Sequence, residues 1–273
     1  MNKDQAVSET LRSPLLTPRL RAPVLRWVPV WQRNFRVWYK LAIPAILGNF
    51  GEPLLYLLAL GYGLGSLVGA VQDMPYLVFL ASGIVCSSTM VTATFEGMYS
   101  AYTRMEVQKT WDAMLATPLD IRDVVIGEAL WASTKSVFSG AAILIVAAAL
   151  GAVAGWMALL TLPVMLLTGL CFAAMALVVT AFARNYDFFL YYYTLLVTPM
   201  LLASGVFFPL QHMPEVIQWG AHILPLTHAV ELVRPLITGT APHQPVLHLL
   251  VLIGYAVITI VLAVRLIRRR LMN

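Results

Sequence analysis

The chain has 273 residues, of which 60% are hydrophobic and only 11% are charged, and its formal net charge is +5. Soluble domains carry about 25% charged residues, so this composition excludes an ordinary soluble protein and indicates one that crosses a membrane several times. The positive charge does not indicate nucleic-acid binding, because the Lys and Arg residues flank apolar segments instead of covering a soluble domain.

The chain starts with a polar tail, residues 1–24, and continues at 25–40 with a segment that is amphipathic at helical spacing. One face carries Trp27, Val28, Trp31, Phe35, Trp38 and Tyr39, and the other carries Arg26, Arg33, Arg36 and Lys40. Aromatic rings opposite cations are typical of a helix at the membrane–water boundary, which is the predicted position. A soluble helix that packs on a partner is the alternative.

Six apolar segments reach the roughly 20 residues that a bilayer-spanning helix needs. They are Leu41–Tyr62, Tyr76–Tyr99, Val124–Leu150, Met157–Phe182, Phe188–Phe208 and Val246–Ile267. The sequence therefore predicts an all-α polytopic membrane protein with six transmembrane helices. The transmembrane domain occupies residues 41–267, and a basic tail follows at 268–273.

The distribution of cations predicts the orientation of these helices. All but two of the 18 Lys and Arg residues lie on the side of the N-terminus, if the chain crosses the membrane six times. The exceptions are Lys135, inside the third segment, and Arg234. Because Lys and Arg concentrate on the cytoplasmic side, both termini are expected in the cytoplasm.

The longest connection on that side, Ala101–Glu128, predicts a short helix at about 107–117. Val107, Trp111, Met114 and Leu115 share one helical face, and Pro118 ends the helix. An apolar face exposed to the cytoplasm must be covered. Either it packs back on the ends of its own spans, or it docks into a groove on another protein.

Polar and aromatic residues in or beside the spans are candidates for a substrate path: Glu52, Tyr193, Thr198, Phe207 and Phe208. A charge at the bilayer centre costs ~3 kcal/mol, so Glu52 must face either a polar path or free backbone groups at a helix break. Tyr193 ends a run of three tyrosines that point in three directions. Such rings suit sugar stacking, but their place near the cytoplasmic end favours a membrane-interface belt.

Two further carboxylates, Glu96 and Glu128, lie near the cytoplasmic ends of the second and third spans. Their positions favour the membrane interface over a specific function.

Residues 204–240 are too apolar for a solvated loop and too rich in proline for one helix. Two short helices are expected, one beginning at Pro214 and one near Leu226. The second carries an apolar stripe of Leu226, Ala229, Val230 and Val233, and Pro235 is expected to bend or end it. Together they predict a re-entrant hairpin on the extracytoplasmic face. Glu231 and Arg234, three residues apart, are spaced so that they could pair and lower the cost of burial.

The remaining motifs give negative predictions. The five histidines follow the fifth span, but their spacing matches no metal-ligand motif, so no metal is expected. Cys86 and Cys171 lie in apolar segments and are expected to be buried free thiols. A phosphate-binding GxxxxGK[ST] loop and the HExxH and GxSxG motifs do not occur, so no catalytic residue and no bound cofactor are predicted. The energy for active transport must come from another polypeptide or from an ion gradient.

Several stretches of sequence carry a resemblance to a known family. SGVFFPL, MPEVIQW and LPLTHAVELVRPLI resemble the C-terminal signature of the ABC-2 type transporter permeases, and KTWDAMLATPLDIRDVVIGE is similar to their coupling-helix region. Within the family, RNFRVWYKLAIPAILGNFGEPLLYLLALGYGLG resembles the nodulation protein J subfamily, permeases of lipo-chitooligosaccharide exporters. The resemblance covers roughly Leu25 to Arg270.

The resemblance implies a homodimer in the bacterial inner membrane, surrounded by lipid, that exports an amphiphilic glycan. Two copies of a separate ATPase, similar to nodulation protein I, would bind ATP and Mg²⁺. The resemblance also implies that the short cytoplasmic helix docks on this ATPase through Thr110, Trp111, Asp112, Met114, Leu115, Thr117 and Pro118. Other functions to weigh are a drug or lipid exporter, an ion-driven carrier, and a lipid-modifying membrane enzyme.

Overall fold

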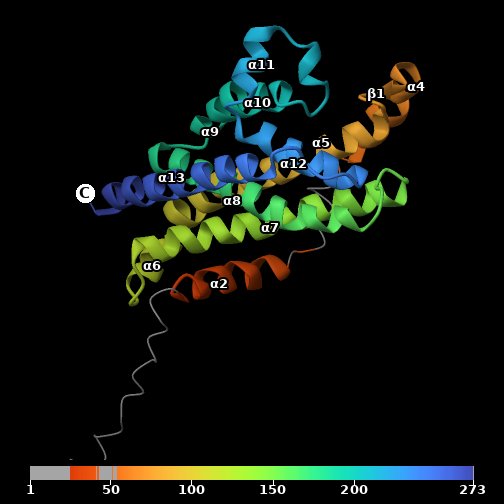
Figure 1. Ribbon diagram of the computed structural model, residues 1–273. Helices are drawn as coiled ribbons and strands as arrows, with labels where there is room; N and C mark the ends of the chain where they lie inside the picture. The colour runs from red at the N-terminus through yellow and green to blue at the C-terminus, as the bar shows by residue number, and fades with distance from the viewer. Residues whose placement is uncertain (1–24, 41, 43–50, 52–53, 273) are drawn as a thin grey trace, which may run out of the picture.

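The computed structural model describes residues 25–40, 42, 51 and 54–272, and the described chain is mostly helical (Figure 1). Its longer helices are α2 (Val28–Tyr39), α5 (Tyr76–Phe95), α7 (Ile121–Ala149), α8 (Thr161–Phe182), α12 (Pro225–Thr238) and α13 (Pro245–Met272). Shorter α-helices are α4 (Gly65–Val68), α6 (Thr110–Leu115), α9 (Asp187–Tyr192), α10 (Thr198–Ala203) and α11 (Glu215–Ala221).

Tighter or wider helical turns extend or join these helices. They are Ala59–Leu64, Glu96–Ser100, Thr103–Val107, Trp156–Leu160, Tyr193–Val197 and Leu210–His212. Strands β1 (Ala70–Val71) and β2 (Met74–Pro75) form an antiparallel hairpin. Gln72 and Asp73 make its two-residue turn with φ values of 50° and 59°, as a tight hairpin turn requires.

In the part of the chain that the structure describes, four continuous helical segments are long and apolar enough to cross a membrane: Tyr76–Val107, Ile121–Ala149, Trp156–Phe182 and Pro245–Met272. They correspond to the predicted second, third, fourth and sixth spans. The predicted first span lies partly outside the described residues, and its described part is the apolar helix Leu54–Val68. The predicted fifth span is helical only over Asp187–Ala203, because the chain turns at Gly205, where φ is +73°.

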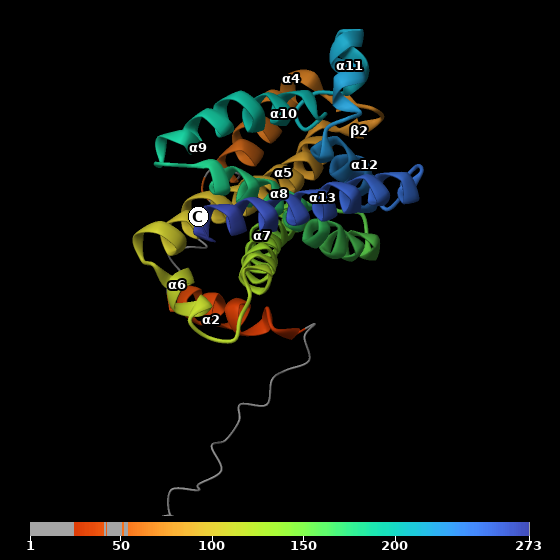
Figure 2. The same ribbon diagram turned by 90° about the vertical axis from the view of Figure 1, so that its left-hand side faces the viewer.

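The core lies where α5, α7 and α8 pack against one another, with α13 on α8 and α12 against α5, α8 and α13. Viewed nearly along α7, α2 lies at one side of this bundle and α9 and α10 at the opposite side (Figure 2). Small residues permit the closest approach. A Cβ on Gly97 would lie 2.9 Å from the carbonyl oxygen of Ala173 on α8. Gly169 of α8 faces Ser133 and Ser136 of α7.

The amphipathic segment forms α2, and its aromatic face packs along α7. The Nε1 of Trp31 donates a hydrogen bond to Thr134 Oγ1 (3.1 Å), and the rings of Trp31, Phe35 and Trp38 surround that of Trp131. Much of the face expected at the membrane boundary therefore contacts protein.

The described basic residues around α6 and in the last turns of α13 lie at one end of the bundle, since α6 and the C-terminal end of α13 meet there (Figure 1). Arg268 pairs with Asp120 (2.7 Å), and Arg270 pairs with Glu106 (2.8 Å) and donates to the carbonyl oxygen of Thr180. These bonds hold α13 helical to Met272, through the residues predicted as a tail. The tail boundary at residue 268 thus lies inside a helix.

The stretch 204–240 contains the two expected helices, α11 after Pro214 and α12 from Pro225. The predicted apolar stripe of α12, which is Leu226, Ala229, Val230 and Val233, is buried. The expectation that Pro235 bends or ends this helix is wrong in part, since α12 continues to Thr238. Pro235 lies within the last turn, so it removes only one backbone hydrogen bond, and burial of Leu236 and Ile237 stabilises the turn.

Candidate substrate cavity and coupling surface

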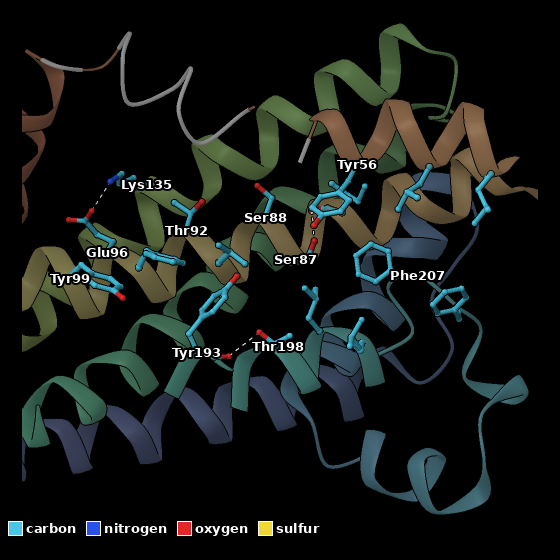
Figure 3. A pocket seen from close by; sticks show the side chains of 18 of the residues that line it. Tyr56, Ser87, Ser88, Thr92, Glu96, Tyr99, Lys135, Tyr193, Thr198 and Phe207 are labelled. Carbon is cyan, nitrogen blue, oxygen red and sulfur yellow. Dashed lines mark hydrogen bonds and ion pairs between the residues drawn. The ribbon is translucent and has the colours of Figure 1, made fainter. Parts of the chain in front are cut away.

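A cavity of about 820 Å³ opens between the helix Leu54–Val68, α5, the segment from Tyr193 to Leu202, and the chain that follows α10. A cavity of this size accommodates a drug-sized molecule or part of a larger one. Its lining differs from wall to wall (Figure 3).

The α5 wall carries a polar stripe beside apolar residues. Ser88, Thr92, Glu96 and Ser100 follow one another at four-residue spacing and, with Ser87, line the cavity. Residues four apart lie on the same face of a helix, so the hydroxyl groups form a continuous stripe. Several are oriented by local bonds: Ser87 donates to the carbonyl oxygen of Ile84 (3.1 Å), and Ser88 is hydrogen-bonded to Ser139 (2.8 Å). The stripe can bind a ligand's hydroxyl and amide groups.

Aromatic side chains from four segments line the rest of the cavity: Tyr56, Tyr76, Phe95, Tyr99, Tyr193, Phe207 and Phe208. Phe95 and Tyr193 meet edge to face, with ring centroids 5.3 Å apart, and Tyr56 lies 6.1 Å from Phe207. Flat rings beside hydroxyl groups suit both the apolar faces of sugars and an acyl chain.

The structure brings four of the five predicted path residues, Tyr193, Thr198, Phe207 and Phe208, to this one cavity. Thr198 Oγ1 donates to the carbonyl oxygen of Tyr193 (3.1 Å), which orients it across the local helical turn. Glu52 lies outside the described residues. The three tyrosines diverge as predicted: Tyr193 lines the cavity, whereas Tyr191 is 63% exposed on the outer surface.

One end of the cavity is charged. The Nζ of Lys135, on α7, lies 2.7 Å from Glu96 Oε2, and both residues line the cavity. Trp131 Nε1 donates to the other oxygen of Glu96 (2.9 Å). Glu96 was expected only at the membrane interface and Lys135 had no predicted function. The polar four-residue spacing on α5 was the available signal, together with the cost of a lone lysine in an apolar span.

The short helix α6 covers the bundle end with one face and exposes the other. Trp111 is fully buried, and its Nε1 donates to Glu128 Oε1 (3.2 Å). Thr110, Met114 and Leu115 are half-buried, whereas Asp112, Thr117 and Pro118 are exposed. The chain's own spans therefore cover Trp111 fully and Met114 and Leu115 in part, whereas Val107 of the same predicted stripe is 63% exposed. The surface left for a partner is the opposite side of the helix.

Backbone conformation and local hydrogen bonds mark the two ends of α6. Lys109, with φ of +51°, precedes α6, and Thr117 Oγ1 donates to the carbonyl oxygen of Met114 (2.6 Å) just after it. Asp120 then caps α7: its side chain accepts from Ile121 N (2.8 Å), and Asp123 accepts from Asp120 N (3.0 Å).

The predicted ion pair between Glu231 and Arg234 is wrong, since the described residues contain no such pair. Arg234 is buried and donates to Ser82 Oγ (2.9 Å) and to the carbonyl oxygen of Gly205 (2.7 Å). Glu231 is exposed to solvent one turn earlier on α12. Helical spacing placed the two residues near each other, but burial turned the arginine toward α5.

Two of the histidines meet. His228 Nδ1 and His248 Nδ1 lie 2.8 Å apart, and His228 Nε2 lies 2.9 Å from the carbonyl oxygen of His222. Within the described residues, no group of three or more His, Cys, Asp or Glu side chains is arranged to hold a metal ion. Cys86 and Cys171 are buried free thiols, as predicted.

A helical membrane protein with a large amphiphilic cavity is built as a transport protein. The model of the ABC-2 type transporter family matches residues 27–237, and the chain therefore belongs to this family, as its sequence motifs predicted. Membership of this family identifies a transport subunit and not a catalyst.

Several relatives share a more particular name. The chain is 48% identical over 250 residues to nodulation protein J of Rhizobium leguminosarum bv. trifolii, an alignment that covers 91% of this chain and 95% of that protein. It is 45% identical over 247 residues to nodulation protein J of Rhizobium meliloti (strain 1021), covering 90% and 94%. A more distant relative is the inner membrane transport permease YadH of Escherichia coli (strain K12), 24% identical over 209 residues, covering 75% and 78%.

Proposed function

We propose that the chain is the membrane subunit of an exporter that moves an acylated oligosaccharide of the lipo-chitooligosaccharide type out of the cytoplasm. The observation that carries this proposal is the division of the cavity lining. The Lys135–Glu96 pair and Thr92 lie at one end of the cavity, which Arg104 and Glu128 link to Trp111 of α6, and Tyr56 and Phe207 lie toward the other end (Figure 3). Such a lining fits a molecule with a polar end and an apolar end.

The direction of this division also fits the proposal. If the α6 end faces the cytoplasm, as the cations gathered there suggest, the polar end of the cavity lies at the inner leaflet. An amphiphile in that leaflet carries its glycan toward the cytoplasm and its chain toward the bilayer centre. It therefore enters this cavity without turning over.

The rest of the assembly is part of the proposal. The chain acts as a homodimer in the inner membrane, with six spans, both termini in the cytoplasm and the segment 204–240 forming the extracytoplasmic hairpin. Two copies of a nodulation protein I-like ATPase bind ATP and Mg²⁺ and dock on the exposed side of α6. Membership of the ABC-2 family supports an ABC ATPase as the energy source.

Transport by the reconstituted complex tests the proposal. The chain and its ATPase are placed in inside-out proteoliposomes, and ATP-dependent uptake is measured for an N-acylated chitin oligosaccharide. The same oligosaccharide without its acyl chain and a hydrophobic cationic dye serve as comparisons. The proposal expects uptake of the acylated glycan alone. Uptake of the dye but not the glycan would instead establish a drug exporter, and uptake without ATP would establish an ion-driven carrier.

A further inference from the structure

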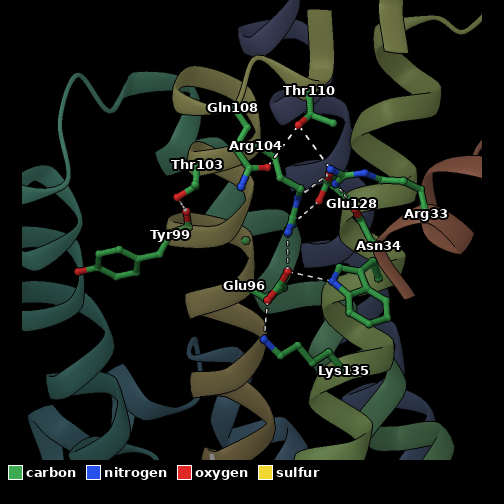
Figure 4. A network of polar contacts seen from close by, with 12 residues as sticks. Arg33, Asn34, Glu96, Tyr99, Thr103, Arg104, Gln108, Thr110, Glu128 and Lys135 are labelled. Carbon is green, nitrogen blue, oxygen red and sulfur yellow. Dashed lines mark hydrogen bonds and ion pairs between the residues drawn. The ribbon is translucent and has the colours of Figure 1, made fainter. Parts of the chain in front are cut away.

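A network of buried charged side chains lies between α6 and the cavity (Figure 4). Arg104 is its centre: Nη1 lies 2.9 Å from Glu96 Oε1, and Nε and Nη2 lie 3.0 and 2.5 Å from the two oxygens of Glu128. Lys135 extends the network from Glu96 along α7. Trp111 extends it from Glu128 into α6.

The network pairs opposite charges and is largely buried. Its two carboxylates, Glu96 and Glu128, face two cations, Arg104 and Lys135, and the four side chains are 1–19% exposed. Separating a buried ion pair leaves an unpaired charge in a medium of low dielectric constant, which is far more costly than separating a surface pair. Separation of the helices that carry these groups is therefore energetically costly.

The two ends of the network lie in different functional regions. One end is α6, through the hydrogen bond of Trp111, with Thr110 also in contact with Arg33 of α2 (3.5 Å). The other end is the cavity, since Glu96 and Lys135 line it. Arg104 and Glu128, which join the two ends, do not line the cavity.

We propose that this network couples the occupancy of the cavity to the position of α6, with Arg104 and Glu128 as positioning residues. A ligand hydroxyl or amide that bonds Lys135 or Glu96 redistributes the bonds of Glu96, and Arg104 and Glu128 pass the change to Trp111. Coupling is reciprocal, so a displacement of α6 alters the binding of the ligand's polar end by the same factor. The inference rests on the proposed function for the identity of the ligand only.

A first experiment needs no ligand. Amide hydrogen exchange is measured on the full chain in lipid nanodiscs, for the wild type and for Glu96→Gln. Coupling predicts that the substitution at the cavity raises exchange in residues 110–115 by about fivefold or more. Lys135→Met gives a second perturbation from the cavity side if Glu96→Gln does not fold. Unchanged exchange in α6 in a folded variant would overturn the proposal.

Matched controls separate coupling from general loosening. Ser88→Ala alters the same cavity wall outside the network, and Arg268→Gln removes the exposed ion pair with Asp120 at the same end of the bundle. Both are expected to leave exchange in residues 110–115 at the wild-type value. An increase as large as that of Glu96→Gln in either control would show loosening of the whole end and would also overturn the proposal.

A second experiment adds an N-acylated chitin oligosaccharide. Binding to the wild type is expected to change exchange in residues 110–115, and Glu128→Gln is expected to bind the glycan while α6 no longer responds. Binding to the wild type without a response in α6 contradicts the coupling. Absence of binding contradicts the proposed substrate, and the ligand-free exchange then decides the coupling by itself.

Discussion

The guanidinium of Arg234 lies over the ring of Phe79, with 3.8 Å between its central carbon and the ring centroid. The same side chain donates to Ser82 on α5 and to the carbonyl oxygen of Gly205. Gly205 starts the turn that leads to Phe207 and Phe208 at the end of the cavity. Arg234 therefore fastens α12, α5 and this wall of the cavity together.

Replacing Arg234 by methionine should destabilise the protein by about 3 kcal/mol. The substitution keeps most of the buried volume but removes the cation and leaves the Gly205 carbonyl group and Ser82 without this donor. Thermal unfolding in detergent, followed by fluorescence, measures the loss as a decrease in Tm.

Glu231→Gln is the matched control on the same helix. Glu231 is exposed, and its replacement should leave Tm unchanged. A decrease in Tm of Glu231→Gln equal to that of Arg234→Met would instead indicate that the two residues form an ion pair.

Much of the helical framework follows from the sequence, because a run of apolar residues long enough to span a bilayer forms a helix whatever its neighbours are. Tyr76–Val107 and Ile121–Ala149 correspond to two such predictions. An amphipathic stripe likewise identified the buried face of α12. The stripe of α6 was equally clear, but periodicity does not tell which surface covers Trp111.

The charged network could not be predicted in the same way. Glu96, Arg104, Glu128 and Lys135 are separated by up to 39 residues and meet only because α5 packs on α7. Their pairing depends on the rotation of each helix about its axis, which hydropathy does not give. The pairing of Arg234 failed as a prediction for the same reason, since its choice between Glu231 and α5 is a matter of tertiary burial.

Gly83 is required where the turn after α10 crosses α5. A Cβ at this position would lie 2.4 Å from the carbonyl oxygen of Val206, which belongs to the backbone and cannot rotate away. Gly83→Ala should therefore destabilise the protein by about 1–3 kcal/mol, measured by thermal unfolding. Gly254→Ala, in a helix with open space around it, should be neutral or slightly stabilising. Equal losses in the two variants would show that helix packing in general, and not the crossing, is responsible.

Tyr193 and Tyr191 form a matched pair for the cavity, because they are two residues apart on the same segment and only Tyr193 lines it. Tyr193→Ala should weaken binding of an N-acylated chitin oligosaccharide by about fivefold, since it removes a ring that contributes roughly 1 kcal/mol of contact. Tyr191→Ala should leave the affinity unchanged. Titration of the purified chain in nanodiscs with a fluorescent acylated glycan gives both values. A larger loss in Tyr191→Ala would place the binding surface outside the cavity.

The exposed side of α6 offers a test of ATPase docking that the buried side does not. Trp111→Ala removes a fully buried indole and should cost about 3–5 kcal/mol of stability, so a loss of transport in that variant would say nothing about docking. Asp112→Arg changes an exposed residue and should lower the affinity for the ATPase by about tenfold or more while Tm stays the same.

Arg269→Glu reverses an exposed charge on α13 at the same end of the bundle and should leave the affinity unchanged. Pull-down of the ATPase by each variant, with its Tm measured in parallel, compares them. If Asp112→Arg retains the ATPase as well as the wild type does, docking through α6 is wrong, and the contact must lie elsewhere on this end of the protein.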